Sequence, residues 1–110
     1  MVEQKHSQDE IFHALSDASR RAMIERLAQS DHTVGELAEP LDMTFAGVSK
    51  HIGVLEGAGL VTRRKRGRER VCSLQLNGLL AVRDWVEKYS AFWNARLDAL
   101  DAALKEDSDD

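Results

Sequence analysis

Basic side chains gather in one short stretch of the chain, where they suit the binding of phosphate groups. Residues 60–76 hold six bases and one acid, a local net charge of +5. Two β-rich runs, 61–65 and 69–74, flank a glycine at position 67, a pattern typical of a hairpin. Cationic side chains at such a tip bind the backbone or the minor groove of DNA. We expect DNA contacts from Arg64, Arg66 and Arg68.

A second candidate surface precedes the hairpin, on a predicted helix that begins after Thr44. Val48, Ile52 and Leu55 recur at spacings of four and three, so they should face a protein core. The opposite face is then small and polar apart from Phe45, as required of a helix that approaches base edges in the major groove. The predicted contacts of this helix are Thr44, Ala46, Gly47, Ser49, Lys50 and His51.

These two surfaces need supporting elements, and the flanking residues predict them. Thr33 and Glu36 form a capping box for a short helix, which Pro40 should end because proline lacks a backbone donor. Thr44 caps the next helix, and glycines at 57 and 59 stop it. Together with the hairpin, the order predicts a mainly α winged helix-turn-helix with a small β-hairpin.

Helices are also predicted at both ends of the chain. The first should run over about 8–15 after a capping box of Ser7 and Glu10, and the second over 18–29 after Asp17. Asn77 should cap a last helix over about 78–105, followed by a disordered tail at 106–110. The last helix has more apolar surface than a small domain covers, which favours a homodimer. The predicted interface residues are Ile11, Phe12, Tyr89, Phe92, Trp93, Leu97 and Leu100.

Composition limits the classes of protein that fit. The 110 residues suit a single domain over 1–110, and a net charge of −4 conceals the basic hairpin. The start has no apolar signal segment, no run is long enough for a membrane span, and one cysteine fits a reducing cytoplasm. No phosphate-binding glycine loop, nucleophile elbow or HExxH pattern is present, so we do not expect an enzyme.

With these elements in order, the sequence resembles the ArsR/SmtB-type winged-helix repressors. The resemblance implies a homodimer joined through the first and last helices. It also implies binding to double-stranded operator DNA that blocks transcription until an inducer loosens it. It covers about residues 8–105, and its segments are 14–21, 33–38, 48–52, 55–61 and Gly67-Arg68.

The sequence departs from the metal-sensing members of that family. Ala38 and Pro40 occupy the stretch in which those members carry a cysteine pair, and the last helix has no histidine. We therefore expect the non-metal-sensing branch, with no metal and no other cofactor. An intersubunit site that uses His6 or His13 stays open, as do a metal- or redox-responsive repressor and a winged helix for protein or RNA contact. The sequence does not identify the operator, the regulated genes or the inducer.

Overall fold

The computed structural model describes residues 8–108, which form two compact units that divide after Leu80. Among its described residues the first unit, up to Leu80, contains four complete α-helices, a small sheet and the start of a fifth helix, and the second is helical over residues 81–108. The sequence predicts one domain over 1–110, and this stays a prediction beside the two units.

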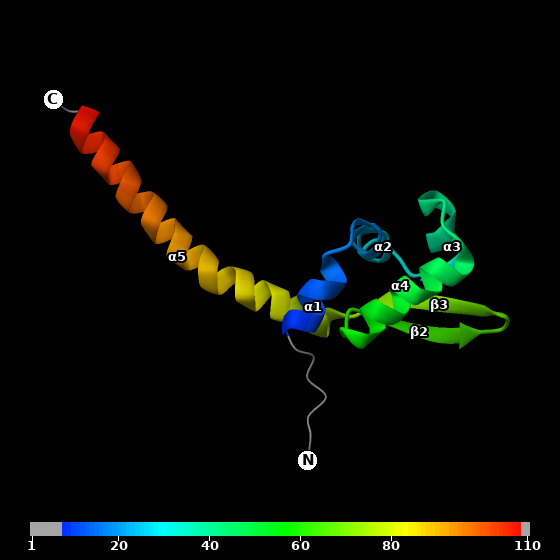
Figure 1. The fold of residues 1–110 in the computed structure, drawn as a ribbon. Helices are drawn as coiled ribbons and strands as arrows, with labels where there is room; N and C mark the ends of the chain where they lie inside the picture. Colours follow the sequence, from blue (N-terminus) through cyan, green and yellow to red (C-terminus); the bar gives the residue numbers. More distant parts are fainter. Residues whose placement is uncertain (1–7, 109–110) are drawn as a thin grey trace, which may run out of the picture. The chain divides into compact units, whose positions relative to one another are not determined.

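The helices of the first unit follow the predicted order (Figure 1). The first helix has the predicted bounds, whereas the second ends two residues earlier than expected, at Leu27. Its cap is the one predicted, because the Asp17 side chain accepts a hydrogen bond from the backbone of Arg20. Ser7, the expected first cap, lies outside the described residues. The bounds are α1 Gln8–Leu15, α2 Ala18–Leu27, α3 Val34–Ala38 and α4 Phe45–Gly57.

Both caps predicted around the helix-turn-helix are present. The Thr33 hydroxyl accepts from the Glu36 backbone at 3.1 Å, while the Glu36 carboxylate accepts from the Thr33 backbone at 2.7 Å. The Thr44 hydroxyl accepts from the backbone of Gly47 at 3.0 Å. Helix α3 ends at Ala38, and Pro40 lies in a 3₁₀ turn, η1, over Glu39–Leu41. The turn between α3 and α4 is therefore short, as the sequence predicts.

The sheet has one strand more than the predicted hairpin. Strands β2 (Val61–Arg66) and β3 (Glu69–Leu74) pair antiparallel, and Gly67 takes the positive φ of 63° that their tight turn requires. A short β1 (His32–Thr33), expected as part of a loop, pairs with the other side of β3. The strand order is β1-β3-β2, so β3 is the central strand.

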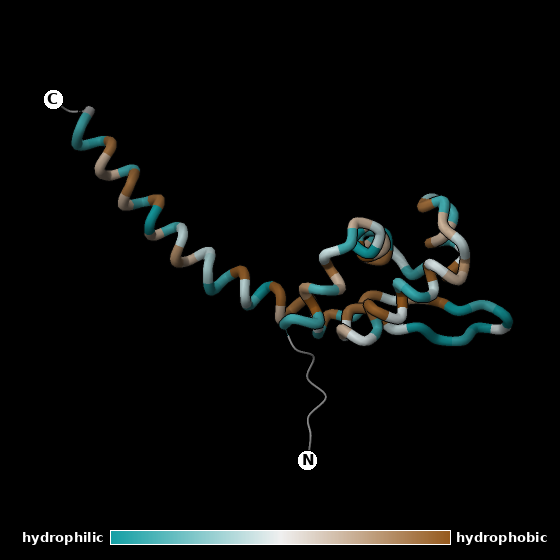
Figure 2. Tube along the Cα trace, in the orientation of Figure 1, coloured by the Kyte–Doolittle hydropathy of each residue, from teal (hydrophilic) through white to brown (hydrophobic). Residues whose placement is uncertain are grey.

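The core of the first unit lies between its helices and the base of the sheet. The three inward positions predicted for α4 are fully buried. Figure 2 shows the division along the hairpin, with hydrophobic residues near its base and a hydrophilic tip. The tip is thus held at a fixed place by a buried base. The largest fully buried side chains are Ile11, Met23, Val34, Leu37, Val48, Ile52, Leu55, Leu60, Val71 and Cys72.

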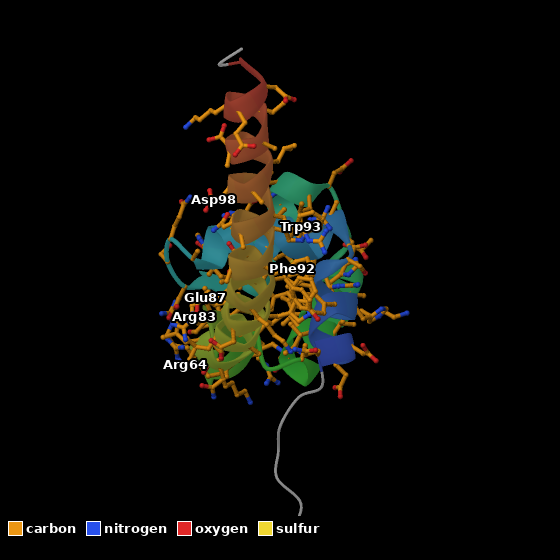
Figure 3. The ribbon with its side chains drawn as sticks, turned by 90° about the vertical axis from the view of Figure 1, so that its left-hand side faces the viewer. Arg64, Arg83, Glu87, Phe92, Trp93 and Asp98 are labelled. Atoms are coloured by element: carbon orange, nitrogen blue, oxygen red, sulfur yellow. The ribbon has the colours of Figure 1, made fainter. Side chains whose placement is uncertain are left out.

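Helix α5 runs from Leu76 to Ser108 and is longer than predicted at both ends. Asn77 lies inside it, so the prediction that Asn77 caps the helix is wrong. The helix also continues through residues 106–108, which were expected to belong to a disordered tail. Helical periodicity places its apolar residues in one stripe. Figure 3 shows Phe92 and Trp93 on one side of α5, and Arg83, Glu87 and Asp98 on the other.

Candidate nucleic-acid interface

The predicted outward face of α4 is accessible over most of its length. Thr44, Ala46 and Lys50 are exposed, and Ser49 is half-buried. Phe45, the first residue of the helix, has 60% of its surface exposed. Val48 lies on the other face and is fully buried, so the helix presents one side to the core and one side to a partner.

Gly47 has a structural role beside its predicted contact role. A Cβ at this position would lie 3.1 Å from the Thr44 hydroxyl and 3.6 Å from the terminal methyl of Met43. The first of these contacts is tight, and it involves the atom that caps α4. Gly47 therefore lets the cap form and keeps the start of the helix narrow.

His51, one of the predicted DNA contacts, also has a hydrogen-bond partner within the first unit. Its Nδ1 lies 3.0 Å from Nη1 of Arg20, and the ring is half-buried. A guanidinium group can only donate hydrogen bonds, so Nδ1 accepts this one. The ring is thus anchored to α2 through Nδ1, and its contact with DNA stays a prediction.

Arg63, which the sequence did not single out, links the hairpin to α4. Its guanidinium donates to the Ser49 hydroxyl and to the Glu56 carboxylate, in both cases at 2.7 Å. Ser49 is therefore held in place by a residue of β2. The alternation of side chains along β2 could have predicted this contact. Arg63 lies on the same face of the strand as the buried Val61, so it points toward the protein interior.

The basic side chains on the opposite face of the hairpin already form ion pairs with acidic residues. Arg64 donates to the Ser73 hydroxyl at 2.7 Å and pairs with Asp31 at 3.2 Å. Hydrogen bonds from Ser73 and Arg64 lower the pKa of Asp31 below its usual range. Arg66 pairs with Glu69 at 3.4 Å. Two of the three predicted hairpin contacts thus have acidic partners within the first unit.

Beyond Arg63, the face of the hairpin that is turned toward α4 carries bases without acidic partners. Lys65 lies directly across from Arg70, and within residues 8–108 neither they nor Arg68 form an ion pair. Like charges that face each other across strands are destabilising unless an anion lies between them. Sequence analysis did not select Lys65 or Arg70, because charge alone does not separate the two faces.

A groove of about 600 Å³ separates this basic face from α4. Helix residues, of which Phe45 is the exposed one, line one side of it, and arginines of the hairpin line the other. Such a groove can hold an anionic chain such as a phosphate backbone. Helix α4 can then contact the bases beside that backbone. Its lining residues are Val34, Phe45, Ser49, Glu56, Arg63, Arg68 and Arg70.

The remaining candidate residues differ in how far they are buried. Ile11 is 2% exposed, so it packs in the core of its own unit, and its part in the dimer interface stays a prediction. The other six expected interface residues are all exposed. Cys72 is fully buried, and this burial raises the pKa of its thiol, which keeps it in the unreactive protonated form. His6 lies outside the described residues.

Metal binding and membrane insertion are two further functions on which the described residues bear. Residues 8–108 contain no group of three or more histidine, cysteine or acidic side chains arranged to hold a metal ion. No helix in the same range is long and apolar enough to cross a membrane.

Comparison with known proteins adds relatives of matching architecture. Residues 15–64 match a family model described as a helix-turn-helix domain. The chain is 38% identical to the HTH-type transcriptional regulator Rv2034 of Mycobacterium tuberculosis over 104 residues, 94% of each chain. It is 28% identical to the transcriptional repressor SdpR of Bacillus subtilis over 69% of this chain and 84% of the relative. The crystal structure of the ArsR family transcriptional regulator RHA00566 is similar with a TM-score of 0.72 and 38% identity, over 78% of this chain and 89% of that one.

Proposed function

Because the chain belongs to the ArsR family of winged helix-turn-helix transcriptional regulators, we propose that it is a homodimeric repressor of a palindromic operator. In this proposal α4 enters the major groove, and the β2–β3 hairpin binds the adjacent backbone. The protein acts in the cytoplasm, where it meets its DNA, and it performs no catalytic step.

One observation carries the DNA contact: the bases without partners face α4 across the groove. Arg68 and Arg70 line the groove together with Phe45 and Ser49 of α4, and Lys65 lies directly across from Arg70 on the neighbouring strand. Phosphates that neutralise these cations release counterions and relieve the repulsion between Lys65 and Arg70. The hairpin then positions the protein, and α4 contacts base edges.

The dimer is supported by the apolar stripe of the second unit. Tyr89, Trp93, Leu97 and Leu100 are all exposed and recur at spacings of four, four and three, on one side of α5. A helix with that pattern is stable in water when the stripe is covered. A second copy covers it by two-fold symmetry, and a two-fold dimer presents two copies of α4 to two half-sites.

Repression follows from occupancy of an operator and is the role that the name of SdpR gives to that relative. For the inducer we propose only a class: it is an organic molecule or a protein that acts on the dimer helices. Metal independence remains part of the proposal. Zinc sites in proteins are built mainly from thiolate and imidazole ligands, and isolated carboxylates bind zinc poorly by comparison. Micromolar zinc should then change operator affinity by less than about tenfold, or 1.4 kcal/mol.

The decisive experiment selects DNA from a random pool with the full chain and sequences the fragments that it retains. We expect an imperfect palindrome with half-sites about one helical turn apart, or a multiple of it. Fluorescence anisotropy then measures affinity across a salt series, with Lys50→Ala expected to lose about 1–3 kcal/mol on the selected site. Absence of binding to any DNA at about 50 mM salt, where electrostatic attraction is strong, contradicts the proposal.

A further inference from the structure

Phe45 stands out on the surface that we assign to DNA. It is the first residue of α4 and, at 60% exposure, the one large apolar side chain of this helix that is exposed. Its neighbours Ala46 and Gly47 are small, and the next outward side chain is the hydroxyl of Ser49. The phenyl ring is therefore the bulkiest apolar group that the start of α4 offers to a partner.

The position of Phe45 indicates which chemical group of the DNA its ring would contact. The ring lines the same groove as Arg68 and Arg70, so phosphates bound by these arginines would bring bases toward the start of α4. An α-helix fits the major groove, which is about 12 Å wide, and does not fit the minor groove of about 6 Å. In the major groove the 5-methyl group of thymine is the apolar group at the base edges.

We propose that Phe45 contacts the 5-methyl group of a thymine in each operator half-site. The inference rests on the proposed DNA-binding function, and it names one base that the protein recognises. Burial of the methyl group against the ring removes apolar surface of both from water, which hydrogen-bonding side chains cannot do. Each half-site should then contain one A·T pair whose methyl group is required, so a two-fold operator contains two.

The test removes single methyl groups from the DNA. Each thymine of a selected operator is replaced in turn by deoxyuridine, which has the same hydrogen-bonding groups without the methyl. For the unmodified protein we expect one position per half-site where affinity falls about fourfold, the ratio that corresponds to one buried methyl or methylene group. At all other thymines the replacement should have little effect.

Variants then assign the effect to one side chain. Phe45→Ala should bind the thymine and deoxyuridine operators equally, whereas Phe45→Leu should retain part of the preference. Lys50→Ala serves as the matched control, because it should weaken binding and keep the full response to deoxyuridine. Thermal unfolding checks that each variant folds, which the exposure of Phe45 favours.

The outcomes separate this inference from the proposed function. Equal affinity of the unmodified protein for every deoxyuridine operator overturns the contact, although the protein still binds DNA. A response that persists in Phe45→Ala assigns the methyl group to another residue and also overturns it. Failure to bind any DNA contradicts the proposed function instead.

Discussion

Arg20 of α2 and His51 of α4 are joined by a hydrogen bond of 3.0 Å at the centre of the first unit. Arg20 is 8% exposed, and the rest of its guanidinium is also in use. Its Nε donates to the Ala14 carbonyl at 2.7 Å, and its Nη2 donates to the His13 carbonyl at 3.1 Å. One side chain therefore satisfies the C-terminus of α1 and fixes the orientation of α4.

Arg20→Met should lower the free energy of unfolding by about 2–4 kcal/mol, because the buried carbonyl of Ala14 loses its charged donor. His51→Ala should lower it by about 1 kcal/mol, since it removes one acceptor. Arg21→Met is the matched control, because Arg21 also bonds a carbonyl of this turn, at 2.9 Å, but is exposed. Urea unfolding measures all three. A loss in Arg21→Met as large as that in Arg20→Met would show that burial does not set the effect.

The two faces of the hairpin should differ in DNA binding. Arg70→Ala should weaken binding to all sequences and reduce the salt slope by about one, as expected for the loss of one phosphate contact. Arg64→Ala is the control on the neighbouring face, where the side chain is already paired with Asp31. Fluorescence anisotropy at several salt concentrations compares them. If the Arg64 variant changes the slope and the Arg70 variant does not, the assignment of faces is reversed.

Trp93→Asp should prevent dimer formation, because it places a carboxylate in the apolar stripe of α5, where burial of a charge is costly. Asn94→Asp adds the same charge one position further along the exposed helix, outside the stripe, and should leave the dimer intact. Analytical ultracentrifugation gives the oligomeric state of each. An unchanged dimer in the Trp93 variant would place the interface elsewhere.

Local chemistry explains which parts of the structure the sequence could predict. The caps at Thr33 and Thr44 and the burial of Val48, Ile52 and Leu55 depend on residues within one or two helical turns. Such short-range patterns are visible in a sequence because the contacting residues lie at fixed spacings.

Contacts between distant residues account for the differences. The His51–Arg20 bond spans 31 positions, and β1 forms only because β3 supplies partners from some 40 residues away. In the same way, strand alternation predicts two faces of the hairpin, but only the packing against α4 shows which one carries bases without partners. The sequence therefore predicted the basic surface correctly in kind, while its choice of arginines remains untested.

Acid should destabilise the first unit through its capping box. The backbone of Thr33, and then its hydroxyl, hydrogen-bond Glu36 and lower the pKa of this carboxyl below its usual value. A carboxyl whose pKa is lowered by folding binds more protons in the unfolded chain, so its stabilising effect is complete above the unfolded pKa of about 4.3 and is lost as pH falls through the folded pKa.

Glu36→Gln should therefore flatten the dependence of unfolding free energy on pH below about pH 4.5, because glutamine keeps the acceptor and does not titrate there. Asp17 and Asp31, whose pKa values are also lowered, should account for the dependence that remains. Urea unfolding between about pH 3 and pH 6.5 gives both curves. An identical slope for the variant and the unmodified chain would show that the capping box does not titrate with folding.

Gly78 should resist replacement although it lies inside a helix, where alanine is usually better by about 1 kcal/mol. A Cβ at this position would lie 2.6 Å from Cδ2 of Leu60 and 3.0 Å from the carbonyl oxygen of Gly59. Leu60 is fully buried and the other contact is backbone, so neither can move easily. Gly78→Ala should therefore lower the unfolding free energy by about 1–3 kcal/mol, as overpacking does.

Gly57→Ala is the matched control, because a Cβ at this exposed position of α4 would have no atom within 4 Å. It should raise the unfolding free energy by about 0.5–1 kcal/mol through reduced freedom of the unfolded chain. Chemical unfolding of the two variants under identical conditions should thus give effects of opposite sign. A stabilised Gly78 variant would mean that the first turn of α5 does not rest on the 59–60 segment, and that the base of the helix is packed by other contacts.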